Sequence, residues 1–295
     1  MARFTTSDGV ALEHAVHHAD GDLTPIVLVM GYIMPGHVWR FVVPHLDPRR
    51  PVLWWDHRGA GRSDAPDPKR VPYTMARLAQ DGVELMDHLG WERAHVVGVS
   101  MGGMVAQRLT LDHPERVASL ALIATHAGGR LANFVPRARG VWHFVRSMTR
   151  RGPGRFASLA RLLFPEGYRR EVGERRLLDV LAIDLAIPSP PAGRKGQLQA
   201  VGKHDARARL HELGRVPTLV VKPELDLLIH PRCSDELHRG IPGSTLVTYA
   251  DAGHGLVRQH GEALGRAILD NIARAPGEAA PPPETAPRRA SDGAR

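Results

Sequence analysis

The stretch VVGVSMGGMVAQ, residues 96–107, decides how the whole chain is interpreted. It places Ser100 between Gly98 and Gly102, after a run of apolar β-formers and before a run that is typical of a helix. In this G-x-S-x-G pattern a strained turn holds the serine, and side chains at the glycine positions would clash with the neighbouring strand and helix. The stretch predicts a nucleophilic serine, with an ordinary glycine-rich turn as the alternative. Because a serine hydroxyl alone is a weak nucleophile, the rest of the chain must supply a base, an acid and two oxyanion donors.

Strands and helices alternate on both sides of this stretch. Residues 3–18 alternate in polarity and predict a hairpin that turns at Asp8-Gly9. Amphipathic helices are predicted at 74–90 and 262–275. Continuous apolar runs predict buried strands at 25–31 and 51–59, and further strands are predicted at 117–125, 217–224 and 244–254. This alternation indicates an α/β fold with a mostly parallel sheet and helices on both faces.

The alternation is interrupted in the middle of the chain. Residues 127–208 contain no convincing core strand and carry short amphipathic runs rich in arginine, glycine and proline. They predict a helical insertion into a core formed by residues 1–126 and 209–275. The last segment, 276–295, has many prolines and few apolar side chains, which predicts a disordered tail.

Composition narrows the classes of partner. The longest apolar runs, such as 26–30, are too short to cross a bilayer, and Cys233 is the only cysteine, so we expect a cytoplasmic protein without disulfides or a membrane anchor. The net charge of +8 raises the question of nucleic acid, and arginines recur about every fourth residue from Arg130 to Arg176. No nucleic-acid-binding motif accompanies them, so a solvated surface is the preferred interpretation, with attraction of an anionic substrate as the alternative. The histidines of HAVHH (14–18) have no convergent ligand, and no metal is expected.

Candidate partners for the serine follow later strands. Asp226 comes just beyond one of the predicted strands, in the loop where an orienting acid is needed, and Glu224 is a second candidate. His254 lies in a short glycine-flanked loop, DAGHG, after the residues STLVTY. His230 and His260 are weaker candidates for the base, because neither directly follows a predicted strand.

The order Ser100, Asp226, His254 along the chain resembles that of the α/β-hydrolase fold serine hydrolases. Four further segments are similar to that family: LVMGY (28–32), DHRGAGRSDAP (56–66), VPTLVVKPELD (216–226) and AGHG (252–255). The resemblance covers about residues 3–275, with Met30 standing where the family usually has a histidine. It implies a mostly parallel eight-stranded sheet, with residues 127–208 forming a helical cap over the site.

The resemblance also implies acyl transfer without a metal or organic cofactor. His254 would take the proton of Ser100, Asp226 would orient the imidazole, and the backbone N–H groups of Tyr32 and Met101 would hold the oxyanion. The expected reaction is hydrolysis of a carboxylic ester, lactone or thioester of a small molecule or natural product. Alternatives on the same fold are a carbon–carbon bond hydrolase, a cofactor-free peroxidase or dioxygenase, and a non-catalytic ligand-binding protein.

The substrate pocket is expected between the core and the cap. Met30 and Gly31 would line it from the oxyanion segment. Three aromatic residues of the cap are candidates for an apolar wall of the pocket, with packing inside the cap as the alternative: Phe134, Trp142 and Phe144.

Overall fold

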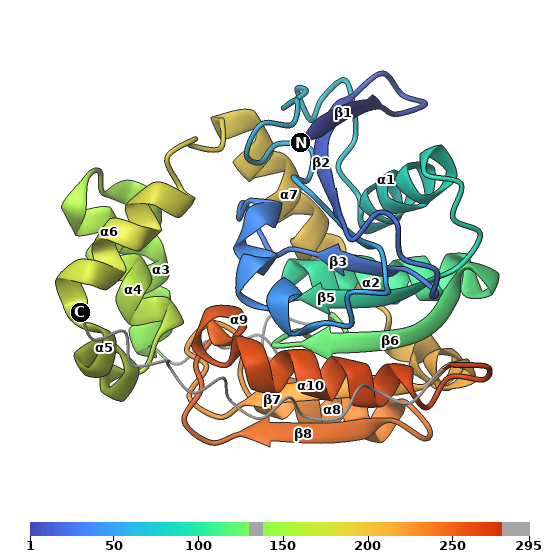
Figure 1. Ribbon diagram of the computed structural model, residues 1–295. Coiled ribbons are helices and arrows are strands. Elements are labelled where there is room, and N and C mark those ends of the chain that lie inside the picture. Colours follow the sequence, from blue (N-terminus) through green and yellow to red (C-terminus); the bar gives the residue numbers. More distant parts are fainter. Residues whose placement is uncertain (130–137, 279–295) are drawn as a thin grey trace, which may run out of the picture.

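The computed structural model describes residues 1–129 and 138–278, and Figure 1 shows a twisted sheet between layers of helices. The sheet has eight strands in the order β1-β2-β4-β3-β5-β6-β7-β8. The first two strands pair antiparallel as the predicted hairpin, β2 also pairs antiparallel with β4, and the remaining neighbours are parallel. The expected mostly parallel sheet is therefore confirmed. The strands are β1 (Ala2–Thr5), β2 (Ala11–His17), β3 (Ile26–Val29), β4 (Val52–Trp55), β5 (Ala94–Val99), β6 (Val117–Ile123), β7 (Thr218–Pro223) and β8 (Thr245–Tyr249).

Helices cover both faces of this sheet, which explains why the central strands are apolar throughout. In β3, Val27 and Val29 pack on one face, whereas Ile26 and Leu28 pack on the other. The first face is covered by α1 (Met75–His88), α2 (Met101–Asp112), η5 (Arg207–Arg215) and α8 (Arg232–Gly240). The second face is covered by η1 (Gly36–Phe41), η2 (Val43–His45), α9 (Leu256–Gln259) and α10 (Gly261–Ile272).

Between β6 and β7 the chain forms further helices. Their bounds are α3 (Ala138–Thr149), α4 (Pro153–Leu163), α5 (Glu166–Val172), α6 (Glu174–Asp184) and α7 (Pro191–Lys203). Of these, α3 to α6 stand beyond the carboxyl ends of the parallel strands in Figure 1. This helical insertion has a small core of its own around Phe164, Leu177 and Leu181. Its two ends meet, because the N–H of Ala206 donates to the carbonyl of Ala127 at 2.7 Å. Across the described residues, we find no helix that is long and apolar enough to span a membrane.

The start of the expected disordered tail is held in place. The carboxylate of Glu278 accepts a hydrogen bond from Arg50 at 2.7 Å and lies 3.2 Å from Nε2 of His95, and all three side chains are buried. The expectation of disorder from residue 276 onward is thus wrong for these first residues, because one acidic side chain satisfies a buried guanidinium. Residues 279–295 lie outside the described part of the chain.

A buried ion network fixes the loop that follows β4. Arg58 donates to both oxygens of Asp81 at 2.6 and 2.7 Å and to Asp8 at 2.8 and 3.0 Å. The side chains of Arg58 and Asp81 are completely buried. The hydrogen bond from Arg58 holds the pKa of Asp8 well below its usual range. The network therefore connects the β4 loop to α1 and to the first hairpin.

We expect Arg58→Met to lower the free energy of unfolding by about 3 kcal/mol, because it removes the fully buried partner of Asp81 and leaves that buried carboxylate with Arg77 alone, at 2.9 Å. Chemical denaturation measures the loss. Arg3→Met is the control, since it removes an ion pair with Asp64 at the surface, where the two side chains are 54% and 50% exposed. This substitution should lower the free energy of unfolding by at most about 1 kcal/mol. Equal losses in the two variants would contradict the importance of the buried network.

Candidate active site

Ser100 lies at the junction of β5 and α2 in a backbone conformation that is unusual for a residue with a side chain. Its φ is +57° and its ψ is −123°. The turn is close-packed on both sides: a Cβ at Gly98 would lie 2.3 Å from the carbonyl oxygen of Gly102, and a Cβ at Gly102 would lie 2.1 Å from that of Val29. The two glycines are therefore needed to bring β5 and α2 together around the serine.

Three side chains from the ends of β5, β7 and β8 form a chain of hydrogen bonds. His254 Nε2 lies 2.9 Å from Oγ of Ser100, and His254 Nδ1 lies 2.7 Å from Oδ2 of Asp226. The other carboxylate oxygen, Oδ1, accepts from the N–H groups of Leu228 and Ile229 at 2.7 and 2.9 Å. Because an ionised carboxylate only accepts, the proton lies on Nδ1, and Nε2 is free to accept from the serine hydroxyl. Asp226 is 1% exposed, whereas Ser100 and His254 are each 8% exposed.

The alternative candidates for the acid and the base do not take part in this chain of hydrogen bonds. Glu224 pairs with Lys222 at 2.9 Å and its side chain is 39% exposed. Nε2 of His260 lies 3.0 Å from the carboxylate of Asp251. Nδ1 of His230 accepts from the N–H of Arg232, at the start of α8.

The segment after β3 passes directly over Ser100. A Cβ at Gly31 would lie 3.1 Å from Cβ of Ser100, so any larger residue there would have to push the serine aside by a few tenths of an ångström. Among the described residues, the backbone N–H groups of Tyr32 and Met101 donate to no acceptor, and Met101 opens the first turn of α2, where such groups are free. Both remain available to a bound ligand.

Two buried side chains hold this segment. Nε2 of His57 lies 3.0 Å from the carbonyl oxygen of Met30, and burial lowers the pKa of His57 to about 4, so it is neutral and can donate there. The side-chain carbonyl of Gln197 accepts from the N–H of Ile33 at 2.8 Å, and its amide donates to the carbonyl of Arg58 at 2.9 Å. Ile33 needs such support because its φ is +52°.

The sequence did not reveal these supporting roles. His57 belongs to the quoted DHRG segment, but nothing in that segment indicates a contact with Met30. Gln197 is an ordinary residue of a helix, with no pattern that marks it as completely buried.

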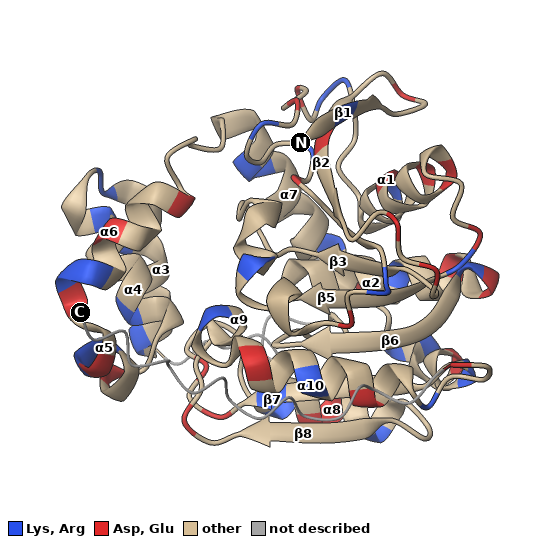
Figure 2. Cartoon of the chain, in the orientation of Figure 1, with Lys and Arg blue, Asp and Glu red and all other residues tan. Residues whose placement is uncertain are grey.

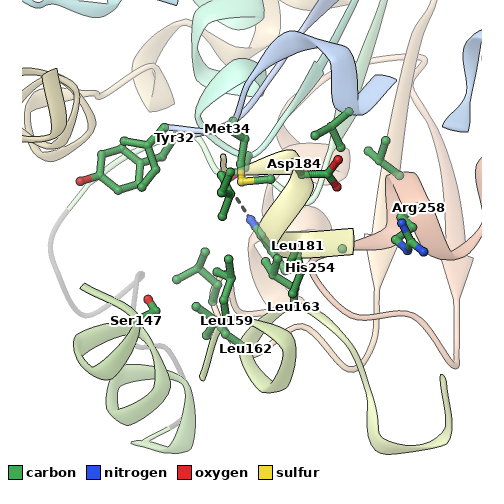
Figure 3. Close-up of a pocket in the computed structure, with 18 of the residues that line it drawn as sticks. Tyr32, Met34, Ser147, Leu159, Leu162, Leu163, Leu181, Asp184, His254 and Arg258 are labelled. Carbon is green, nitrogen blue, oxygen red and sulfur yellow. Dashed lines mark hydrogen bonds between the residues drawn. The ribbon is translucent and has the colours of Figure 1, made fainter. Parts of the chain in front are cut away.

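A largely apolar pocket opens above Ser100, with about 1000 Å³ of empty space, part of which is open to solvent. Figure 3 shows Tyr32 and Ser147 on one side, Asp184 and Arg258 on the other, and leucines of the insertion between them. The leucines are Leu159, Leu162, Leu163 and Leu181.

Three of the five pocket residues expected from the sequence line this space: Met30, Gly31 and Phe144. Trp142 does not, and it is 59% exposed. Two positions along α3 correspond to a rotation of about 200°, so Trp142 and Phe144 face opposite ways. Phe134 lies outside the described residues.

Two charged residues that line the pocket, Asp184 and Arg258, contact neighbouring side chains. Asp184 accepts from Arg40 at 2.5 Å and lies 3.4 Å from His37. Burial opposes the ionisation of Asp184, but these two partners outweigh it and lower its pKa. The guanidinium of Arg258 stacks over Phe41, 4.6 Å from the ring centroid.

We expect Gln197→Leu to lower the free energy of unfolding by about 1–3 kcal/mol, because it leaves the N–H of Ile33 and the carbonyl of Arg58 without partners. Gln199→Leu, at an exposed position of the same helix, is the matched control and should change it little. Thermal or chemical unfolding of both variants makes the comparison. A Gln197 variant as stable as the control would refute a bridging role.

Comparison with known proteins agrees with this architecture. A family model for the alpha/beta hydrolase fold matches residues 24–260. The chain is 31% identical over 277 residues to a protein of Caulobacter sp. (strain K31) named carbamate hydrolase RutD, covering 93% of this chain and 98% of that one.

Two solved structures have the same fold over nearly the whole chain. The enol-lactonase from Burkholderia xenovorans LB400 is 26% identical with a TM-score of 0.76, covering 92% of this chain and 100% of that chain. A thermophilic esterase from Thermogutta terrifontis is 25% identical with a TM-score of 0.73, covering 91% and 97%. From the arrangement of its strands, its site and these matches, the chain belongs to the α/β-hydrolase fold family.

Proposed function

We propose that this hydrolase cleaves a carboxylic ester, lactone or thioester of a small molecule, with Ser100 as nucleophile, His254 as base and Asp226 as orienting acid. The observation that carries the proposal is the unbroken hydrogen-bond chain from the carboxylate through the imidazole to the hydroxyl, at 2.7 and 2.9 Å. That chain ends on a serine that opens into the pocket. In this role the helical insertion, residues 127–208, is the cap of the pocket.

Each step of the reaction follows from this geometry. As Oγ of Ser100 attacks the carbonyl carbon, its proton passes to Nε2 of His254, and Asp226 stabilises the resulting imidazolium. The oxyanion that forms accepts hydrogen bonds from the N–H groups of Tyr32 and Met101. Collapse of the intermediate breaks the bond to the leaving group, which takes the proton from His254. Water then attacks the acyl-enzyme with His254 again as base, and the acid is released.

The pocket favours a substrate with a hydrocarbon portion. Its walls near Ser100 are formed by side chains such as Leu159, Leu162 and Val257, which offer apolar contact and exclude water from the carbonyl. The similarity to an enol-lactonase and to an esterase is in keeping with acyl esters and lactones.

Carbamate hydrolysis is the second candidate, because the relative from Caulobacter, matched over 93% of this chain, carries that name. The same nucleophile would attack a carbamate carbonyl. The apolar walls argue for the ester, since a small polar carbamate would leave them without contacts. Release of ammonia from carbamates, compared with release of acid from esters and lactones of increasing chain length, separates the two candidates.

A fluorophosphonate probe is expected to label the wild-type protein, because it reacts with an activated serine, and Ser100→Ala should abolish the labelling. Circular dichroism of the variant checks that the fold is retained. A well-folded wild-type protein that takes no label would overturn the serine mechanism.

Asp226→Asn is expected to lower kcat by about 10⁴-fold, because the amide would donate to Nδ1 and leave the proton on Nε2, where it cannot accept from the serine. Glu224→Gln, a nearby carboxylate removed in the same way, is the control and should retain near-wild-type kcat. Steady-state kinetics on the best ester of the panel measures both. Equal effects of the two substitutions would refute the assignment of the acid.

A further inference from the structure

The arginines of the insertion differ in how they are neutralised. On its outer surface they alternate with glutamates, as Figure 2 shows for α5 and its neighbours. Arg170 pairs with Glu166, and Arg161 lies 3.5 Å from Glu174. Arg155, near the start of α4, lines the pocket and is partly buried, yet no described residue accepts a hydrogen bond or forms an ion pair with its side chain.

The charge of a second arginine, Arg194, acts on Arg155. Tyr32 lines the pocket, and its hydroxyl donates a hydrogen bond to the backbone carbonyl of Arg194, in α7, at 3.2 Å. Burial lowers the pKa of Arg155, and the charge of Arg194 lowers it further. Burial raises the pKa of Tyr32 and outweighs the opposite effect of the same charge. A partly buried guanidinium without an acidic partner among the described residues is unfavourable, and a bound anion would remove that cost.

The position of Arg155 separates it from the reacting atoms. The carbonyl of Leu163, at the end of α4, accepts from the N–H of Gly255, next to His254, at 2.8 Å. Arg155 comes eight residues earlier in the helix, about 12 Å along its axis. Leu159 and Leu162 line the pocket between these points. A ligand that spans from Ser100 to Arg155 therefore has a hydrocarbon middle and a charged end.

The remaining charged groups of the pocket differ from Arg155. The guanidinium of Arg258 stacks over Phe41, and its Nε and Nη1 are buried without a hydrogen-bond partner among the described residues, whereas Arg155 is only partly buried. Asp184 is the acid among the residues that line the pocket, and it is neutralised by Arg40.

We propose that Arg155 binds a carboxylate carried by the substrate, so that the preferred ester or lactone has a free carboxylate at the end remote from the scissile carbonyl. This inference rests on the proposed hydrolysis at Ser100 and names the class of substrate. Arg155 acts as a specificity-determining residue rather than a catalytic one.

The test compares two esters that differ only in charge: the 4-nitrophenyl ester of suberic acid with its second carboxyl free, and the same compound as its methyl ester. Adipate and sebacate analogues vary the distance between the charge and the reacting carbonyl. We expect wild type to prefer the free acid at one length by about tenfold or more in kcat/KM, because hydrogen bonds to charged groups are strong. Salt should weaken this preference.

Arg155→Gln should remove the preference, chiefly through a higher KM for the acid, so that the acid and the methyl ester are turned over alike. Arg161→Gln is the matched control, because it removes the same charge from the exposed side of the same helix, and it should keep the preference. Equal turnover of the two esters by wild type at every length, or a preference that survives in Arg155→Gln, would overturn the proposal.

A binding measurement keeps this inference separate from the hydrolysis. Calorimetry with monomethyl suberate on Ser100→Ala, with and without Arg155→Gln, needs no turnover. Binding that is lost in Arg155→Gln supports the carboxylate site. This holds even if neither ester is cleaved, because a failure of cleavage would overturn only the proposed hydrolysis. Absence of binding, or binding that is unchanged by Arg155→Gln, overturns the carboxylate site.

Discussion

The close approach of backbone to backbone around Ser100 is the constraint on which the site depends. A Cβ at Gly98 or Gly102 would overlap neighbouring backbone, and a Cβ at Gly31, in the segment that crosses above the serine, would lie only 3.1 Å from Cβ of Ser100. The positive φ of Ser100 is retained because the surrounding sheet, buried on both faces, determines it. Rigidity at this point gives the proposed nucleophile, base and acid a fixed relation to each other, although the serine lies more than a hundred residues before the other two.

The sheet could be predicted from the sequence because its signal is local. Continuous apolar runs marked the strands buried on both faces, and alternation with helices indicated parallel pairing. The order of serine, acid and histidine was equally local, since each follows a strand, and Asp226 rather than Glu224 could be preferred from its position in the loop.

The pocket could be predicted only in part, because which side of a helix faces inward depends on packing. Phe144 and Trp142 are alike in sequence, and only the orientation of α3 separates a lining residue from an exposed one. The buried role of Gln197 is a long-range contact between a helix of the insertion and two loops of the core, and no short pattern encodes it. The same holds for Glu278, whose partners Arg50 and His95 are distant in sequence.

The bridge made by Gln197 limits how freely the insertion can be exchanged. A helix that belongs to the insertion supplies the hydrogen bond that steadies the segment above Ser100. Replacing the whole of residues 127–208 with the corresponding part of a relative would therefore alter the reactive centre along with the pocket walls. An exchange that ends before α7 would keep this support, so new specificities are more readily obtained by recombining α3 to α6 alone.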